Sequence, residues 1–77
     1  MTIREHDVVV LNRDVAEHHL RAGDVGAVVH VYEDGKAYEV EFVTGSGRTL
    51  AVETLELKDI RPLGDGEILH IRKVAAA

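Results

Sequence analysis

The sequence contains no cysteine, no tryptophan and one proline, and it has few aromatic residues. Without cysteine, neither a disulfide nor a thiolate zinc site can stabilise the fold. A 77-residue domain buries only about 60% of the surface that its unfolded chain exposes. We therefore expect the core to depend on aliphatic packing, or on association with another chain. The absence of cysteine is also compatible with a reducing cytoplasm.

The small number of aromatic rings disfavours two kinds of binding site. The polyproline-binding groove of SH3 domains and the methyl-lysine cage both need several exposed rings. The chain has only Tyr32, Tyr38 and Phe42. Tyr38 and Phe42 alternate with polar residues in a strand-like pattern, which assigns them to the core. Only Tyr32 is left for a role at the surface.

Long apolar segments are also missing. No run reaches the length of about 18 residues that a membrane span requires, and residues 1–7 lack the apolar region of a secretory signal. We expect a cytoplasmic protein that makes no membrane contact.

Positive charge is scarce in most of the chain. Residues 1–57 carry 5 basic and 11 acidic side chains, whereas residues 58–77 carry 4 basic and 3 acidic ones, and the net charge is −5. Nucleic-acid backbones repel such a surface. The expected partner is therefore a basic protein and not a nucleic acid.

The apolar patterning predicts an all-β domain. Residues 7–11, 25–32, 38–43, 48–55 and 59–63 read as five short strands. An Asp-Gly pair at 34–35 favours a two-residue hairpin, and residues 45–47 predict a second hairpin. Residues 12–22 predict a long loop with one short helical turn, anchored by Leu20. Gly23 and Gly26 suit a sharp turn with positive φ before the second strand.

Five short strands joined by tight turns predict a small SH3-like β-barrel over residues 1–63. Residues 64–77 form a C-terminal extension that begins with a glycine-rich break. Three motifs within the barrel region occur in order: L-x-x-G-D-V-G at 20–26, Y-E-V-E-F-V at 38–43 and I-R-P-L at 60–63. In these motifs, residues 7–63 resemble a bacterial family catalogued as domain of unknown function 4926. The resemblance implies a small stand-alone SH3-like barrel without an agreed activity. Some members are encoded beside other small proteins, in the manner of toxin–antitoxin pairs, but the family supplies no functional residue.

Three glutamates are candidates for binding a partner. Glu39 and Glu41 lie on the polar face of one strand, and we place Glu53 beside them on the next, with Leu50 and Val52 on the inner face of that strand. Acid–base chemistry would require a cleft that separates their pKa values. The two alternatives are a solvated outer face and an acidic patch that docks a basic protein.

The C-terminal extension supplies a second set of candidates, Ile68, Leu69 and Ile71. These apolar residues follow the point at which the barrel should be complete. They can fold back as an extra strand, or they can pair with a second chain and form a homodimer or a docking surface.

No site for a metal, cofactor or reaction is predicted. His18 and His19 are adjacent, so their side chains point apart, whereas helical metal pairs are four residues apart. The glycines at 23 and 26 precede a strand and not a helix, which disfavours a phosphate loop. No serine has a recognisable catalytic partner. We therefore predict a non-enzymatic interaction module, for which an antitoxin-like role is one interpretation. The alternatives are a histidine-based metal or ligand sensor and an accessory subunit of a larger enzyme.

Overall fold

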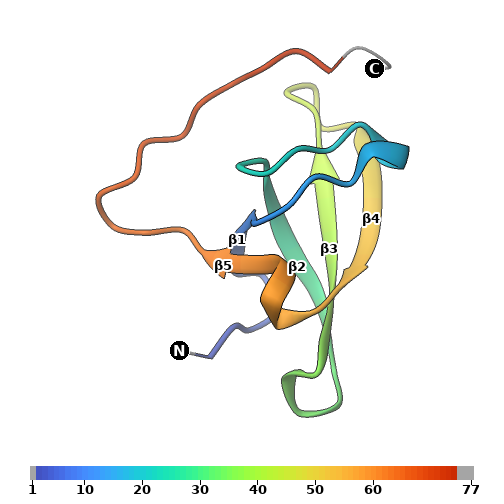
Figure 1. Cartoon of the computed structure of the whole chain (residues 1–77), viewed down its shortest axis with the longest axis vertical. Helices are drawn as coiled ribbons and strands as arrows, with labels where there is room; N and C mark the ends of the chain where they lie inside the picture. The colour runs from blue at the N-terminus through green and yellow to red at the C-terminus, as the bar shows by residue number, and fades with distance from the viewer. Residues whose placement is uncertain (1, 75–77) are drawn as a thin grey trace.

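The computed structural model describes residues 2–74, apart from the side chain at position 34. Five strands account for most of its regular structure (Figure 1). They are β1 (Val8–Leu11), β2 (Val25–Tyr32), β3 (Ala37–Val43), β4 (Thr49–Leu55) and β5 (Ile60–Pro62). Three short 3₁₀ turns lie between them: η1 (Ala16–His18), η2 (Glu33–Gly35) and η3 (Leu57–Asp59). Within the described residues, no helix has the length and hydropathy needed to cross a membrane.

The strands form one antiparallel sheet in the order β4-β3-β2-β1-β5. The predicted all-β class and the five strands are confirmed. The sheet does not close into a barrel, since β4 and β5 are its two free edges.

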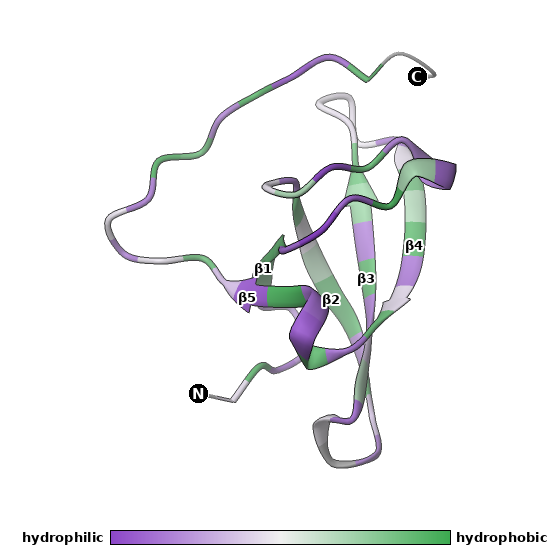
Figure 2. Ribbon diagram, viewed as in Figure 1, coloured by the Kyte–Doolittle hydropathy of each residue, from purple (hydrophilic) through white to green (hydrophobic). Residues whose placement is uncertain are grey.

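The core lies on the concave side of the sheet. Tyr38, Val40 and Phe42 of β3 all point into it, as their alternation predicts, and each is at most 4% exposed. Figure 2 shows the corresponding alternation of apolar and polar positions along β3. The core cluster is completed by residues from the N-terminal segment, the long loop and the strands: Ile3, Val9, Leu11, Val15, Leu20, Val28, Ala51, Leu55 and Ile60.

The register of β4 differs from the prediction. Val40 is opposite Glu53 and Phe42 is opposite Ala51, so Glu53 and Ala51 share the inner face of the sheet. Val52 is 48% exposed on the other face. An irregularity between Phe42 and Val43 shifts the ladder by one residue, and a shift of one residue exchanges the two faces of a strand. The prediction that Val52 faces inward was therefore wrong, whereas Leu50 does pack partly against the core.

The two glycines before and within β2 have different roles. Gly23 has a φ of +96°, as a sharp turn requires. Gly26 has no positive φ and pairs with Val9 inside the sheet. A Cβ at Gly26 would lie 2.7 Å from Val40 Cγ1 and 2.8 Å from Phe42 Cε1. Close packing, and not backbone conformation, thus requires glycine at position 26.

The loops agree with the predictions in outline. The long loop contains one helical turn, η1, and Leu20 is buried as its anchor. The hairpin at residues 34–35 is present, but its closing pair is Tyr32 with Ala37. Its loop therefore spans residues 33–36 as a 3₁₀ turn, and not the two residues predicted.

Residues 64–74, here called the strap, leave β5 and arch back towards the end of the sheet that carries η1 (Figure 1). None of these residues belongs to a strand. The extra strand predicted for the C-terminal extension is therefore not formed within the described part of the chain. Alternating apolar and polar residues line the strap (Figure 2), but within residues 2–74 its backbone forms no hydrogen bond with the backbone of a strand.

Candidate interaction surfaces

The convex side of the sheet, here called the outer face, carries two of the predicted glutamates. Strand pairing places Val8 opposite Ala27, Ala27 opposite Glu41, and Glu41 opposite Val52. Directly opposed residues in antiparallel strands point to the same side. These four residues therefore form a row across β1, β2, β3 and β4. Next to this row, a second one joins His30, Glu39 and Thr54.

Both outer-face glutamates are oriented by threonines of β4. Thr49 Oγ1 donates a hydrogen bond of 2.5 Å to Glu41 Oε2, and Thr54 Oγ1 donates to Glu39 Oε1. The two glutamates are half-buried, and among residues 2–74 neither forms an ion pair. Each carboxylate therefore retains oxygen lone pairs for a further donor.

Exposed valines lie on the strands that carry and flank these carboxylates, and Val52 is directly opposite Glu41. Val8 is 44% exposed, Val29 is 43% exposed and Val52 is 48% exposed. Val29 is the additional residue at the irregularity in the β2–β3 ladder, which breaks the alternation of that strand. The outer face therefore combines two oriented negative charges with exposed apolar surface.

Glu53 does not belong to this surface. Its carboxylate lies on the inner side of the sheet, where Oε2 is 2.9 Å from His18 Nε2, and its side chain is 19% exposed. Here η1 covers the end of the core, and the histidine partners a carboxylate that would otherwise face apolar residues. The predicted patch of three glutamates is therefore wrong in one member. The structure brings Glu39 and Glu41 together and separates Glu53 from them.

Asp59 is a buried acid that the sequence did not single out. It is 6% exposed, and its Oδ1 accepts a 2.9 Å hydrogen bond from Arg13 Nε. Its Oδ2 accepts a 3.0 Å bond from the Glu56 amide. Burial alone would raise the pKa of Asp59, but the Glu56 amide and the Arg13 guanidinium outweigh it and lower the pKa. Asp59 is almost fully buried, and its two hydrogen bonds connect the long loop to η3.

The strap is attached to the domain at its first turn. Arg61 Nη1 and Nη2 donate to the two carboxylate oxygens of Glu67 at 2.6 and 2.7 Å. The Gly64 amide donates to Glu67 Oε1 at 2.6 Å. The Arg61 hydrogen bonds, followed by that amide, lower the pKa of Glu67 to about 2. This bidentate pair fixes the direction in which the strap leaves β5.

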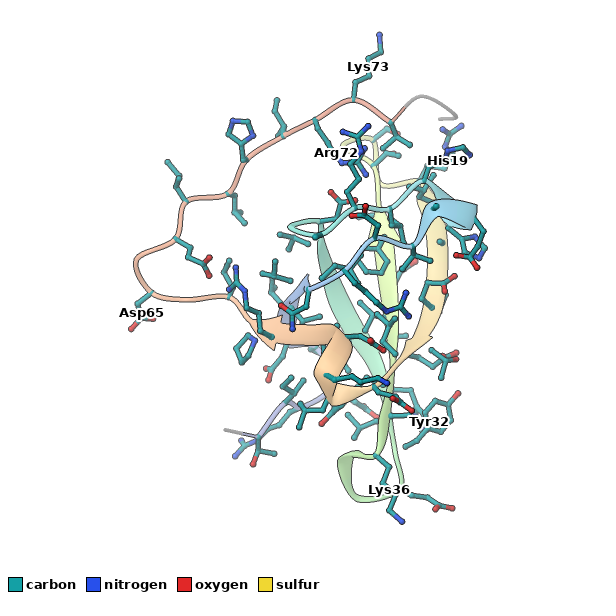
Figure 3. All side chains as sticks on the ribbon, viewed as in Figure 1. His19, Tyr32, Lys36, Asp65, Arg72 and Lys73 are labelled. Atoms are coloured by element: carbon teal, nitrogen blue, oxygen red, sulfur yellow. The ribbon has the colours of Figure 1, made fainter. Side chains whose placement is uncertain are left out.

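A second attachment holds the far end of the strap. Arg72 Nε donates to Asp24 Oδ1 at 2.8 Å, and Nη2 donates to Asp24 Oδ2 at 2.5 Å and to the His19 carbonyl at 2.8 Å. Figure 3 shows the Arg72 side chain turned towards the domain, while Lys73 points away. Burial would raise the pKa of Asp24, but the hydrogen bonds from Arg72 and the Arg21 amide lower it. The left-handed backbone at His19, with a φ of 60°, presents this carbonyl to Arg72.

Between its attachments, the strap exposes the predicted apolar residues. Ile68 is 90%, Leu69 is 63% and Ile71 is 91% exposed. The backbone of residues 68–71 forms no hydrogen bond with the backbone of residues 2–74. Beneath the end of the strap lies a cavity of about 520 Å³, lined by Asp24, Arg72 and mainly apolar residues that include Leu20, Phe42, Leu50 and Leu69. The strap therefore spans apolar surface without filling it.

The histidines do not converge. His18 contacts Glu53, His30 Nδ1 lies 3.7 Å from Glu5 Oε2, and His70 belongs to the strap. Across residues 2–74, the structure contains no group of three or more His, Asp or Glu side chains arranged to hold a metal ion.

Comparison with known proteins supports the sequence resemblance. A family model described as a domain of unknown function (DUF4926) matches residues 5–62. The match covers all five strands and ends at the last residue of β5, so the strap lies outside it. Searches of curated proteins and of solved structures found no match.

Proposed function

The chain belongs to the DUF4926 family, and from this premise we propose that it is a non-enzymatic interaction module that docks a basic protein on its outer face. The observation that carries the proposal is the placement of Glu39 and Glu41 among exposed valines. Interfaces of this type combine an apolar centre with a few charged groups of fixed orientation. The threonine hydrogen bonds supply that orientation before a partner arrives.

The charge of the chain supports a basic partner. A net charge of −5 on 77 residues attracts a cationic surface and accelerates its association. Arginine is the residue best suited to Glu39 and Glu41, because its planar guanidinium pairs with a carboxylate through two hydrogen bonds while its stem packs on apolar side chains. The exposed valines provide that apolar surface.

We also propose a cellular location and a biological role for the protein. A chain without cysteine suits the reducing cytoplasm of a bacterium. In that compartment, an acidic module of this size fits an antitoxin-like role, in which it covers the basic surface of a small co-encoded protein.

The test is capture of a partner by the tagged full chain from its native cytoplasm, compared across two double variants. Glu39→Gln/Glu41→Gln removes both outer-face charges but retains the acceptor oxygens for Thr49 and Thr54. Glu17→Gln/Glu33→Gln removes the same charge from exposed positions in η1 and η2. We expect the wild type and the second variant to capture one basic protein in stoichiometric amount, and the first variant to lose it.

Two results would contradict the proposal. Equal capture by the two variants would show that the outer face is not the docking surface. Capture of a neutral or acidic partner that is insensitive to salt would show that the charge of the chain does not select the partner.

A further inference from the structure

The strap has the properties of an unpaired strand that is held ready for pairing. Its ends are fixed by the Arg61–Glu67 and Arg72–Asp24 pairs, and the backbone between them is free of hydrogen bonds to residues 2–74. Because both ends are fixed, pairing with another strand costs less conformational entropy than it would in a free tail. Ile68 and Ile71 are almost fully exposed on this segment. An extended segment with free backbone groups and exposed apolar side chains is a template for strand addition.

We propose that the strap pairs with the strap of a second copy of this chain, antiparallel, about a two-fold axis between residues 69 and 70. In this register Ile68 lies opposite Ile71 of the second copy, and the symmetry creates this pair twice. Leu69 lies opposite His70 of the second copy. Directly opposed residues in antiparallel strands are in side-chain contact. The pairing therefore shields the two most exposed apolar side chains of the described chain.

The charges of the strap also favour a second copy as the partner and an antiparallel direction of pairing. The strap begins with acidic residues, Asp65 and Glu67, and ends with basic residues, Arg72 and Lys73. Antiparallel pairing brings the acidic end of one strap alongside the basic end of the other, whereas parallel pairing would align like charges. Asp65 and Lys73 both project away from the domain (Figure 3), and neither forms an ion pair within residues 2–74.

The remainder of the surface opposes self-association. Residues 1–57 have an excess of six acidic side chains, 11 against 5, while residues 58–77 have an excess of one basic side chain, 4 against 3. The acidic domains of two copies therefore repel each other, whereas the straps do not. A ribbon of two short straps is smaller than a standard interface of about 1,200–2,000 Å². We accordingly expect a weak dimer, with a dissociation constant of about 10–100 µM.

Sedimentation equilibrium of the full chain over a range of concentrations tests the proposal. The wild type should follow a monomer–dimer equilibrium. Ile68→Ser/Ile71→Ser should be monomeric, while Val52→Ser/Leu57→Ser, which alters two exposed aliphatic residues elsewhere, should dimerise as the wild type does. Monomeric wild type at about millimolar concentration, or unchanged dimerisation of the strap variant, would overturn the proposal.

Cysteine cross-linking tests the register in a chain that has no native cysteine. A mixture of Ile68→Cys and Ile71→Cys chains should form disulfide-linked heterodimers under mild oxidation. Either variant alone should cross-link at least about tenfold more slowly, because equal positions are displaced by three residues, or about 10 Å along the strand, beyond disulfide reach. Equal cross-linking of 68 with 68 would overturn the register.

This inference goes beyond the proposed function and depends on a different surface. The Glu39→Gln/Glu41→Gln variant should dimerise as the wild type does, and Ile68→Ser/Ile71→Ser should retain the outer-face carboxylates. Dimerisation that persists in Ile68→Ser/Ile71→Ser would contradict the dimer alone, and capture that persists in Glu39→Gln/Glu41→Gln would contradict the proposed function alone.

Discussion

Arg72 donates hydrogen bonds to both carboxylate oxygens of Asp24, and this pair joins residues 48 positions apart. Asp24 immediately precedes β2, so the pair connects the strap to the family domain. With 27% and 18% side-chain exposure, respectively, the two groups are shielded enough for the pair to be stronger than an ordinary surface ion pair.

Removing this attachment should release the end of the strap. We expect trypsin to cleave Asp24→Asn at Arg72 and Lys73 about tenfold faster than the wild type, which corresponds to a loss of about 1.4 kcal/mol. Asp65→Asn is the matched control, because it removes a strap carboxylate that forms no ion pair within residues 2–74. Equal cleavage rates in the three proteins would show that the attachment does not restrain the strap.

Acid should destabilise the protein through three carboxylates. The pKa values of Asp24, Asp59 and Glu67 are lowered in the folded state, that of Glu67 to about 2, from ordinary values of 3.8 for Asp and 4.5 for Glu. The unfolded chain therefore binds more protons than the folded chain in this range, so stability rises with pH. The contribution is complete above the unfolded values and is lost as pH falls towards 2.

Urea unfolding at a series of pH values between 2.5 and 6 measures this dependence. We expect the free energy of unfolding to fall steadily below about pH 4.5. The fall should be shallower in Glu67→Gln, since that variant removes one of the three groups. A free energy of unfolding that is constant from pH 6 to 2.5 would contradict the assignment.

The buried Asp59 should matter more for stability than its partner Arg13. Asp59→Ala leaves the Glu56 amide without its acceptor and should cost about 2 kcal/mol. Arg13→Ala should cost less than Asp59→Ala, because the Arg13 side chain is 53% exposed and its ion pair is screened by solvent. Chemical denaturation of both variants checks the order, and a larger loss in Arg13→Ala would contradict it.

Gly26 should not tolerate a methyl group. We expect Gly26→Ala to lower the free energy of unfolding by about 1–3 kcal/mol, because the new Cβ would overlap Val40 and Phe42. Gly45→Ala is the control, since nothing lies within 4 Å of its Cβ position and its φ is not positive. It should be neutral or slightly stabilising. Equal effects of the two substitutions in thermal unfolding would contradict the packing role of Gly26.

The sequence predicted the strands and most of the core because both depend on local alternation. Tyr38, Val40 and Phe42 were assigned inward by this rule, and they are buried. Glu53 was misplaced because the face of β4 depends on an irregularity in its pairing with β3. A ladder irregularity of this kind has no strong signal in one sequence, since the extra residue is set by tertiary packing.

The strap shows a second limit of local patterning. Residues 67–74 contain the apolar residues of a short strand, but a strand also needs a neighbour with free hydrogen-bonding groups. The charged pairs formed by Glu67 and Arg72 attach the segment to the domain through side chains, and within residues 2–74 the backbone of residues 68–71 pairs with no strand. Such attachments join positions up to 48 residues apart, and periodicity carries no information about them. Closure of the sheet also depends on contacts between strands that are distant in the sequence. The number of strands alone therefore did not predict whether the sheet closes into a barrel.

Calorimetric titration of the captured partner is the most direct test of whether a basic protein binds to the outer face. The full chain and Glu39→Gln/Glu41→Gln would each be titrated at low and high salt. If the partner docks through Glu39 and Glu41, the variant binds at least about tenfold more weakly at low salt, a loss of about 1.4 kcal/mol. High salt should reduce this difference. The same affinity for both proteins at both salt concentrations would contradict it.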